Sequence, residues 1–196
     1  MNPSRLIPSL LCAMLAASAS HAANLDVSLG LVNVIPDIES PVVGVEASTE
    51  TKPILNLTYH LNDHLALNTA AGITRHTFSA GGATLGKASM APFHLLLQYH
   101  FKPGAAFSPY VGAGLHHTLF FDKNGAVFDT LRDFPADTGG VLQLGFDYAL
   151  GKDYFINFDV KKFYLKTDVL PGAGGPKIET LTLDPLLVGL AVGRHF

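Results

Sequence analysis

The sequence contains no tryptophan, a single cysteine and little charge. Because Cys12 lies near the N-terminus, the rest of the chain can form no disulfide. Charged residues make up 15% of the 196 residues, the formal net charge is −3, and no basic stripe suggests nucleic acid as a partner. Hydrophobic residues reach 48%, yet beyond the N-terminus no apolar run has the roughly 18 residues of a membrane-spanning helix. An apolar chain without such runs is typical of a transmembrane β-barrel, in which only every second residue faces lipid.

The first 22 residues have the pattern of a secretory signal peptide. Arg5 precedes the apolar stretch 6–19, and residues 20–22 form a small-x-small cleavage site. Leu11, rather than a small residue, precedes Cys12, so we do not expect a lipoprotein. A retained membrane anchor is the alternative, although the apolar run is short for one. We predict export, cleavage after Ala22 and a single domain over residues 23–196.

The last eleven residues alternate between large and small side chains. Leu190 and Val192 fall on one parity, and Gly189 and Ala191 fall on the other. A period of two predicts a strand. In a soluble protein, an apolar strand that ends the chain on Phe196 would leave an unpaired sheet edge prone to association with other chains. A closed barrel in a bilayer instead pairs its last strand with its first. On this segment alone, an ordinary buried C-terminal strand is the alternative.

Eight segments show strand patterning: residues 25–34, 53–61, 65–75, 93–101, 109–121, 141–150, 154–165 and 183–196. Short connections at 62–63, 102–105 and 151–153 alternate with long ones, rich in Gly, Pro and small polar residues, at 35–52, 76–91, 122–140 and 166–182. This alternation is typical of outer-membrane barrels, and an even strand number places both termini in the periplasm. We therefore predict an all-β fold, an eight-stranded antiparallel transmembrane β-barrel with short periplasmic turns and long extracellular loops.

One face of the predicted strands is consistently apolar, and the other mixes polar, small and apolar residues. A lipocalin-like soluble barrel, the alternative, turns its polar face outward. The consistently oily face favours the membrane barrel instead. Aromatic residues near strand ends fit the girdles found at membrane interfaces; they are Tyr59, Tyr99, Phe101, Tyr110, Phe121 and Tyr148.

Five stretches, residues 95–101, 109–115, 143–148, 157–162 and 183–185, resemble the outer-membrane protein W (OmpW) family, in order along the mature chain. The resemblance implies a narrow, partly apolar lumen, passage or binding of small and often hydrophobic molecules, and neither a catalytic centre nor a required cofactor. The chain departs from the family's common Tyr-Arg-Phe ending, because it ends Arg194-His195-Phe196. We expect Arg194 to snorkel to the periplasmic interface.

The inward parity supplies the candidate lumen residues: Ile54, Asn56, Thr58, His94, Leu96, Gln98, His116, Thr118, Phe120, Gln143, Asp147, Asn157, Asp159 and Lys161. Buried charges must pair or be hydrated. We therefore expect Gln98, Gln143, Asp147, Asp159 and Lys161 to form a polar network that narrows the lower lumen; the alternative is that they simply face water in a small pore. Ile54, Leu96 and Phe120 would form an apolar upper wall, and Ile35, Ile38, Val42, Val43, Val45 and Phe134 a greasy mouth.

Histidine chemistry has ordinary explanations in this chain. His116 and His117 are adjacent in a strand, so they point to opposite faces and cannot chelate together; we expect no metal site. His60, His94, His100 and His116 share the inward parity, where neighbours or lumen water could satisfy them as neutral groups. His117 and Asp184 have the outward parity, which favours a position near the rim.

We expect no enzyme activity, because His76-Thr77-Phe78-Ser79 has no oxyanion motif or paired acid beside it. We expect a barrel in the outer membrane of a Gram-negative bacterium that binds and passes small, mostly hydrophobic solutes. The alternative is a plugged structural or surface-interaction barrel without transport. The expected partners are the lipid bilayer with its lipopolysaccharide, the barrel-assembly machinery, which would read the strand ending at Phe196, and the small apolar solutes.

Overall fold

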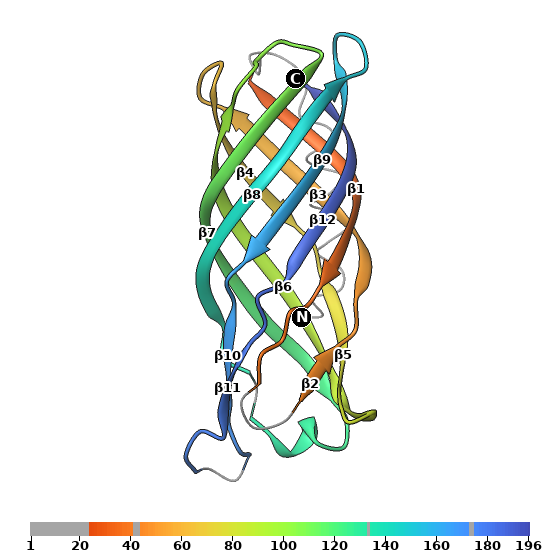
Figure 1. Ribbon diagram of the computed structural model, residues 1–196, viewed down its shortest axis with the longest axis vertical. Coiled ribbons are helices and arrows are strands. Elements are labelled where there is room, and N and C mark those ends of the chain that lie inside the picture. The colour runs from red at the N-terminus through yellow and green to blue at the C-terminus, as the bar shows by residue number, and fades with distance from the viewer. Residues whose placement is uncertain (1–23, 41–43, 133, 173–174) are drawn as a thin grey trace, which may run out of the picture.

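A computed structural model describes residues 24–40, 44–132, 134–172 and 175–196 (Figure 1); the predicted signal peptide lies outside these residues. The strands are β1 (Leu25–Ile35), β2 (Val45–Ala47), β3 (Glu50–His60), β4 (Leu65–Ala71), β5 (Thr74–Ala80), β6 (Ala83–His100), β7 (Phe107–Asn124), β8 (Asp137–Ala149), β9 (Tyr154–Phe163), β10 (Lys166–Val169), β11 (Glu179–Thr182) and β12 (Leu186–His195). A short 3-10 helix, η2, covers Phe128–Thr130.

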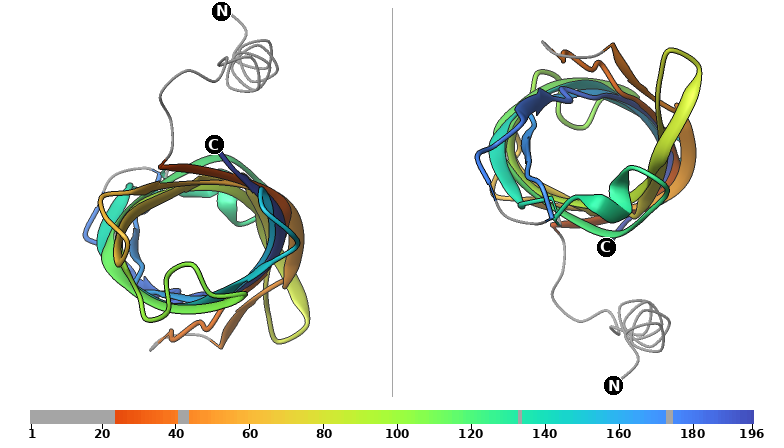
Figure 2. Two further views of the ribbon diagram at one scale, coloured as in Figure 1. Left: turned by 90° about the horizontal axis from the view of Figure 1, so that it is seen from above. Right: turned by 90° about the horizontal axis from the view of Figure 1, so that it is seen from below.

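The strands form a closed antiparallel barrel. Around the ring the order is β6, β4, β3, β1, β12, β9, β8 and β7, and β7 pairs with β6 to close it. The first and last strands pair over their whole length, from Asp26↔His195 to Ile35↔Leu186. Seen along its axis the molecule is a ring (Figure 2). The predicted eight-stranded barrel is confirmed. β4 and β5 both pair with β6, one after the other, and together occupy one of the eight strand positions.

The two ends of the barrel differ as predicted, but the long connections contain more structure than expected. Short turns join β3 to β4, β6 to β7 and β8 to β9 at one end (Figure 1). At the extracellular end, the prediction of a loop over residues 76–91 is wrong. β5 and β6 continue as a hairpin whose turn is formed by Gly81 and Gly82, both with positive φ. The hairpin persists because its inner face, including Phe78 and Met90, packs on other buried residues.

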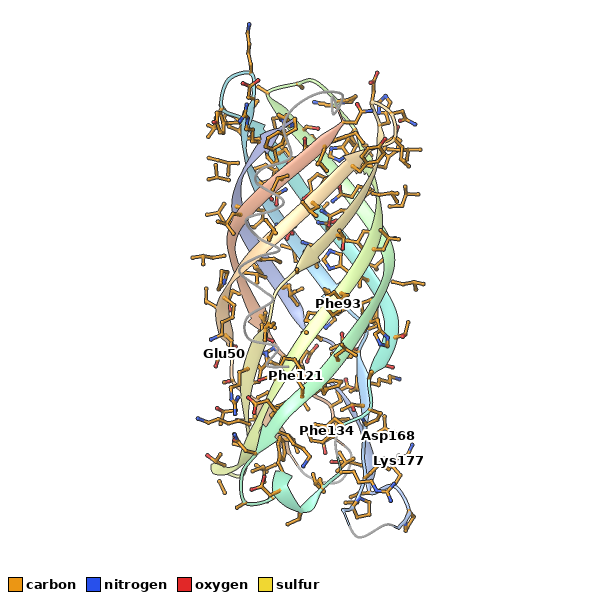
Figure 3. The ribbon with its side chains drawn as sticks, turned by 180° about the vertical axis from the view of Figure 1, so that it is seen from behind. Glu50, Phe93, Phe121, Phe134, Asp168 and Lys177 are labelled. Carbon is orange, nitrogen blue, oxygen red and sulfur yellow. The ribbon has the colours of Figure 1, made fainter. Side chains whose placement is uncertain are left out.

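The outer face of the barrel is apolar over its middle, because alternate residues point outward. Leu144, for example, is 62% exposed, while its neighbour Gln143 is buried. Figure 3 shows side chains projecting from the wall all around the barrel, with Phe93 and Phe121 among the exposed ones. Hydrocarbon is the only medium in which such a surface costs little, so this face lies against lipid. Among the described residues, no helix has both the length and the apolarity to cross a bilayer.

Arg194 lies at the short-turn end on the outer face, as predicted. Its guanidinium carbon is 5.8 Å from the ring centroid of Tyr154 and 4.9 Å from that of Phe196. The charge is therefore held by cation–π contacts with aromatic residues at the periplasmic end. This arrangement accommodates an arginine close to the hydrocarbon.

Side chains fill the interior of the barrel in three layers. The polar layer, at the periplasmic end, is described below. The middle apolar cluster follows and consists of Val32, Val34, Ile54, Ala70, Leu96, Val141, Phe163 and Leu187. The outer apolar cluster, at the extracellular end, consists of Phe78, Ala88, Met90, Phe128, Phe134, Leu165, Val169, Leu181 and Leu183.

Candidate functional site

Three strands build the centre of the polar layer. Gln98 of β6 donates a hydrogen bond from Nε2 to Oε1 of Gln143 on β8 at 2.9 Å, and Gln143 Nε2 donates to Oδ2 of Asp159 on β9 at 2.9 Å. Lys161, two residues along β9 and therefore on the same face, forms a salt bridge with Asp159. Lys161 is 1% exposed and Asp159 4%. These contacts join four of the five residues of the predicted network, and its role in passage stays a prediction.

Tyr110 completes the polar layer and corrects the prediction that it belongs to an interface girdle. It lies inside the barrel and is 2% exposed. Asn157 Nδ2 donates to the Tyr110 hydroxyl and to Asp147 Oδ1, both at 2.8 Å, which joins Asp147 to the network. The register partner of Tyr110 is Gly145, where an added Cβ would lie 2.6 Å from the tyrosine hydroxyl. The inward parity of Tyr110 was visible in the sequence, whereas its glycine partner depends on the register of β7 and β8. The other five expected girdle residues are exposed.

A cavity of about 10 Å³ remains within the polar layer, lined by residues that include Asn56, Thr58, Asn68 and Tyr110. Asn56 Nδ2 donates to Ser28 Oγ at 3.3 Å, and Asn68 Nδ2 donates to Thr58 Oγ1 at 2.9 Å. A space of that size holds about one water molecule. The periplasmic half of the lumen is therefore packed and polar, and in this conformation it leaves no room for an organic solute.

A carboxylate joins three strands at the periplasmic mouth. Asp26 of β1 contacts His60 of β3, with Nε2 2.8 Å from Oδ2, and His195 of β12, with Nδ1 2.6 Å from Oδ1. The contact spans the seam between the first and last strands. Sequence analysis did not select Asp26, because only the pairing of the two chain ends brings it to His195. No group of three His, Cys, Asp or Glu side chains in the described parts of the chain is arranged to hold a metal ion.

Of the remaining inward histidines, His94 and His116 have polar partners from the barrel itself, whereas Nε2 of His100 is buried without a hydrogen-bond partner among the described residues. His94 Nε2 lies 3.2 Å from Asn68 Oδ1. The His116 ring donates from Nε2 to the Tyr164 carbonyl at 2.9 Å, and its Nδ1 lies 3.0 Å from Thr118 Oγ1. On the outer face, His117 is exposed and contacts Thr138 Oγ1 through Nδ1 at 2.8 Å.

Two apolar cavities lie farther from the periplasm and share several lining residues, including Val34, Phe163 and Leu187. One, of about 30 Å³, is also lined by Ile54 and Ala70. The other, of about 20 Å³, is lined by Met90 and Leu165, which belong to the outer apolar cluster. The two linings thus include members of both the middle and the outer apolar cluster. Of the predicted apolar wall, Ile54 and Leu96 belong to the middle cluster and Phe120 packs against the outer one.

The outer apolar cluster closes the extracellular mouth. Phe134 lies at this end of the barrel (Figure 3), and its ring centroid is 5.1 Å from that of Phe128 and 6.1 Å from that of Phe120. Ile38 and Val45 also pack here, whereas Ile35 is 37% exposed at the end of β1. The residues expected to form an open greasy mouth thus include three that pack together in a closed cluster; Val42 and Val43 lie outside the described residues.

The barrel wall is interrupted beside the larger apolar cavity. The β4–β6 ladder ends at Asn68↔Leu96, and pairing with β6 resumes only at Thr74↔Met90. On the other side, the β3–β4 ladder ends at Leu55↔Ala71. Pro53 and Pro92, on the flanking strands, have no N–H to donate, and Gly72 lies between them in the uncoupled segment. All three line the 30 Å³ cavity.

A closed eight-stranded barrel with an oily belt and a side-chain-filled interior defines this chain as an outer-membrane β-barrel. The chain belongs to the OmpW family, whose sequence profile matches residues 15–196.

Relatives and a solved structure agree with this assignment. The uncharacterized outer-membrane protein y4mB of Sinorhizobium fredii is 35% identical over 176 residues, which are 85% of this chain and 73% of that protein. The dibenzothiophene metabolism operon protein PahQ of Pseudomonas aeruginosa is 30% identical over 185 residues, 86% of each chain. The crystal structure of the outer-membrane protein OprG from Pseudomonas aeruginosa superposes with a TM-score of 0.77 at 24% identity, covering 90% of this chain and 98% of that one. The protein is therefore located in the outer membrane.

Proposed function

We propose that this barrel binds small, mostly hydrophobic solutes at its extracellular end and passes them into the membrane. The observation that carries the proposal is the pair of apolar cavities, of about 20 and 30 Å³, whose linings include members of the outer apolar cluster and the residues of the wall interruption. Each has room for only about one or two water molecules, so a solute would pass by displacing the apolar side chains around them. Their linings select by width and polarity, without bond-making. PahQ is named for an operon of dibenzothiophene metabolism, and an apolar sulfur heterocycle is a solute of this chemical kind.

The exit in this proposal is sideways. An apolar solute that continued toward the periplasm would have to separate Lys161 from Asp159 and displace the hydrogen bonds of Gln98 and Gln143. Breaking a buried ion pair costs roughly 3–5 kcal/mol. At the wall interruption, the segment between β4 and β5 has no ladder hydrogen bonds that a solute would have to break. The lipid outside is as apolar as the cavity lining.

The test closes the interruption covalently. If the β3–β4 register continued past Leu55↔Ala71, Pro53 would lie opposite Ile73. The variant P53C/I73C should therefore form a disulfide across the uncoupled segment, in a mature chain that otherwise has no cysteine. The control pair is L57C/T69C, which sits within the intact β3–β4 ladder and faces the same side.

Uptake of dibenzothiophene is measured in cells with and without the protein, under oxidising and reducing conditions. We expect the protein to increase uptake, oxidation of P53C/I73C to abolish that increase, reductant to restore it, and the control pair to be unaffected. Uptake that is independent of the protein would contradict the proposed function. Uptake that persists when the 53–73 disulfide is formed would contradict the sideways exit.

The second candidate function is a plugged structural or surface-interaction barrel. The packed polar layer and the closed outer cluster favour it, because neither leaves a continuous passage in the described conformation. In that case the extracellular connections would bind partners and the interior would serve only stability. Adhesion that depends on these connections, together with uptake and conductance that do not respond to the protein, would support this function over transport.

A further inference from the structure

The ring of Phe128 occupies a notch that only a glycine leaves open. Gly86 lies on the inner face of β6, and a Cβ added to it would sit 2.5 Å from Phe128 Cγ and 2.6 Å from the Asn124 carbonyl oxygen. Gly86 is not among the residues with positive φ, so its backbone would suit other residues. The glycine is therefore required for space and not for conformation. The space it provides is occupied by the Phe128 side chain and the Asn124 carbonyl.

The notch is lined by other aromatic rings. Phe78, the register partner of Gly86, has its ring centroid 5.4 Å from that of Phe128 with an interplanar angle of 48°. Phe134 lies 5.1 Å away at 82°, an edge-to-face contact. Such geometries favour an aromatic ring over an aliphatic one of the same size, beyond the gain from burial. The notch therefore discriminates by ring type as well as by size.

The segment that carries Phe128 covers the notch with a single turn. Phe128 is 5% exposed, whereas the preceding Val127 is 41% exposed. The segment's bonds to the rest of the protein include Val127 N to the Leu85 carbonyl at 3.1 Å and Gly172 N to the Thr130 carbonyl at 2.9 Å. These groups lie at the surface, where water can replace their partners. Gly125, with φ +128°, precedes the turn in a backbone conformation that other residues rarely adopt.

We propose that the notch over Gly86 is a binding site for one aromatic ring of an incoming solute, and that Phe128 fills it until a solute displaces it. This inference rests on the proposed uptake function and specifies the first binding site that a solute would meet. Next to the notch, the ring of Phe134 contacts that of Phe120, with 6.1 Å between the ring centroids. Met90, a member of the same cluster, lines the 20 Å³ cavity that follows.

Met90 also provides a reporter at the site. The chain has three methionines, and Met1 and Met14 lie in the predicted signal peptide, so the processed protein contains Met90 alone. Its ¹³C-labelled methyl group should give a single NMR signal from within the outer apolar cluster. Three signals would show instead that the N-terminal segment is retained. The probe ligands are fluorobenzene and fluorocyclohexane, which have similar size and differ in aromaticity.

Phe128→Ala vacates the notch and should bind fluorobenzene at least about tenfold more tightly than the wild type, because the built-in competitor is gone. Val127→Ala, the matched control on the adjacent exposed residue, should titrate like the wild type. Fluorocyclohexane should bind F128A about 2- to 10-fold more weakly than fluorobenzene. Adding Gly86→Ala to F128A fills the floor of the notch and should reverse the gain.

The proposal is overturned if F128A and wild type titrate alike, if the two ligands bind F128A equally, or if G86A leaves the gain intact. Folding is checked by heat-modifiable migration on a gel. Should F128A not fold, Phe128→Leu replaces it: the leucine lacks the ring contacts, so fluorobenzene should bind more tightly than to wild type, and unchanged binding overturns the site. Binding is measured on purified protein and uptake on cells, so failure of the notch and failure of the uptake function give different results.

Discussion

Replacing Lys161 with methionine tests whether the polar layer holds the barrel together. Lys161 and Asp159 are 1% and 4% exposed, and apart from Lys161 the Asp159 carboxylate accepts a hydrogen bond from Gln143 at 2.9 Å. Methionine has nearly the length of the lysine stem, so Lys161→Met leaves little cavity and removes mainly the charge. A buried carboxylate that loses its cationic partner destabilises a protein by roughly 3–5 kcal/mol. We expect a loss of that size in the free energy of unfolding.

Two further variants separate the charge from packing. Adding Asp159→Asn to K161M removes the stranded carboxylate, and stability should return to within about 1 kcal/mol of the wild type, since buried ion pairs can be replaced by neutral groups at little cost. Lys162→Met is the matched control. Lys162 points outward, its side chain is 31% exposed, and its contact with Asp37 at 3.0 Å is a surface ion pair, worth about 0.2–1 kcal/mol.

Urea unfolding in detergent micelles, followed by circular dichroism, gives these free energies. The chain has no tryptophan, so its fluorescence is a poor probe. K161M as stable as K162M would refute the argument that the pair is structural. A double variant as unstable as K161M would show that packing, and not the unpaired carboxylate, accounts for the loss.

Three other expectations follow from single contacts. Tyr110→Phe removes the hydroxyl that accepts from Asn157 at 2.8 Å; we expect a loss of about 1–3 kcal/mol in urea unfolding, because a buried donor loses a partner. The hydrogen bond from Thr180 lowers the pKa of Asp168 on the extracellular hairpin, so this carboxylate stabilises the hairpin above its usual pKa and the contribution is lost as the pH falls through the lowered value. Limited proteolysis over a pH series from 7 down through the acid range below 3.8 should show that loss, and Asp168→Asn should remove it. Deleting Phe196 should reduce the folded fraction in outer membranes, as read from heat-modifiable migration.

The barrel itself could be predicted because a membrane imposes its pattern on every second residue. The same rule placed Asp159 and Lys161 on one face, two residues apart, where their pairing follows from the strand period. Tyr110 was misassigned because an aromatic residue near a strand end suits a girdle equally well. Its inward direction becomes decisive only once Gly145 is known to be its partner across the strands.

Features that depend on register could not be predicted. The contact of Asp26 with His195 requires the pairing of residues 169 positions apart. Small and polar residues over 76–91 suggested a loop, because beyond the membrane the outer face of a strand meets water and loses its oily alternation. Gly86 looks like a loop glycine in the sequence, and its role is visible only when Phe128 is placed over it.

Under the proposed uptake function, the distribution of polar contacts along the lumen favours one direction of travel for a solute. At the extracellular end, the interior is covered by the outer apolar cluster, whose members meet through apolar contacts. At the periplasmic end, buried groups from β6, β8 and β9 are joined in a continuous network, and each would lose its partner without access to bulk solvent. Between the two ends, the wall lacks ladder pairing beside Gly72. An apolar solute therefore disrupts the fewest buried polar contacts by entering from outside and leaving at mid-height into lipid, the direction that the 53–73 disulfide is designed to block.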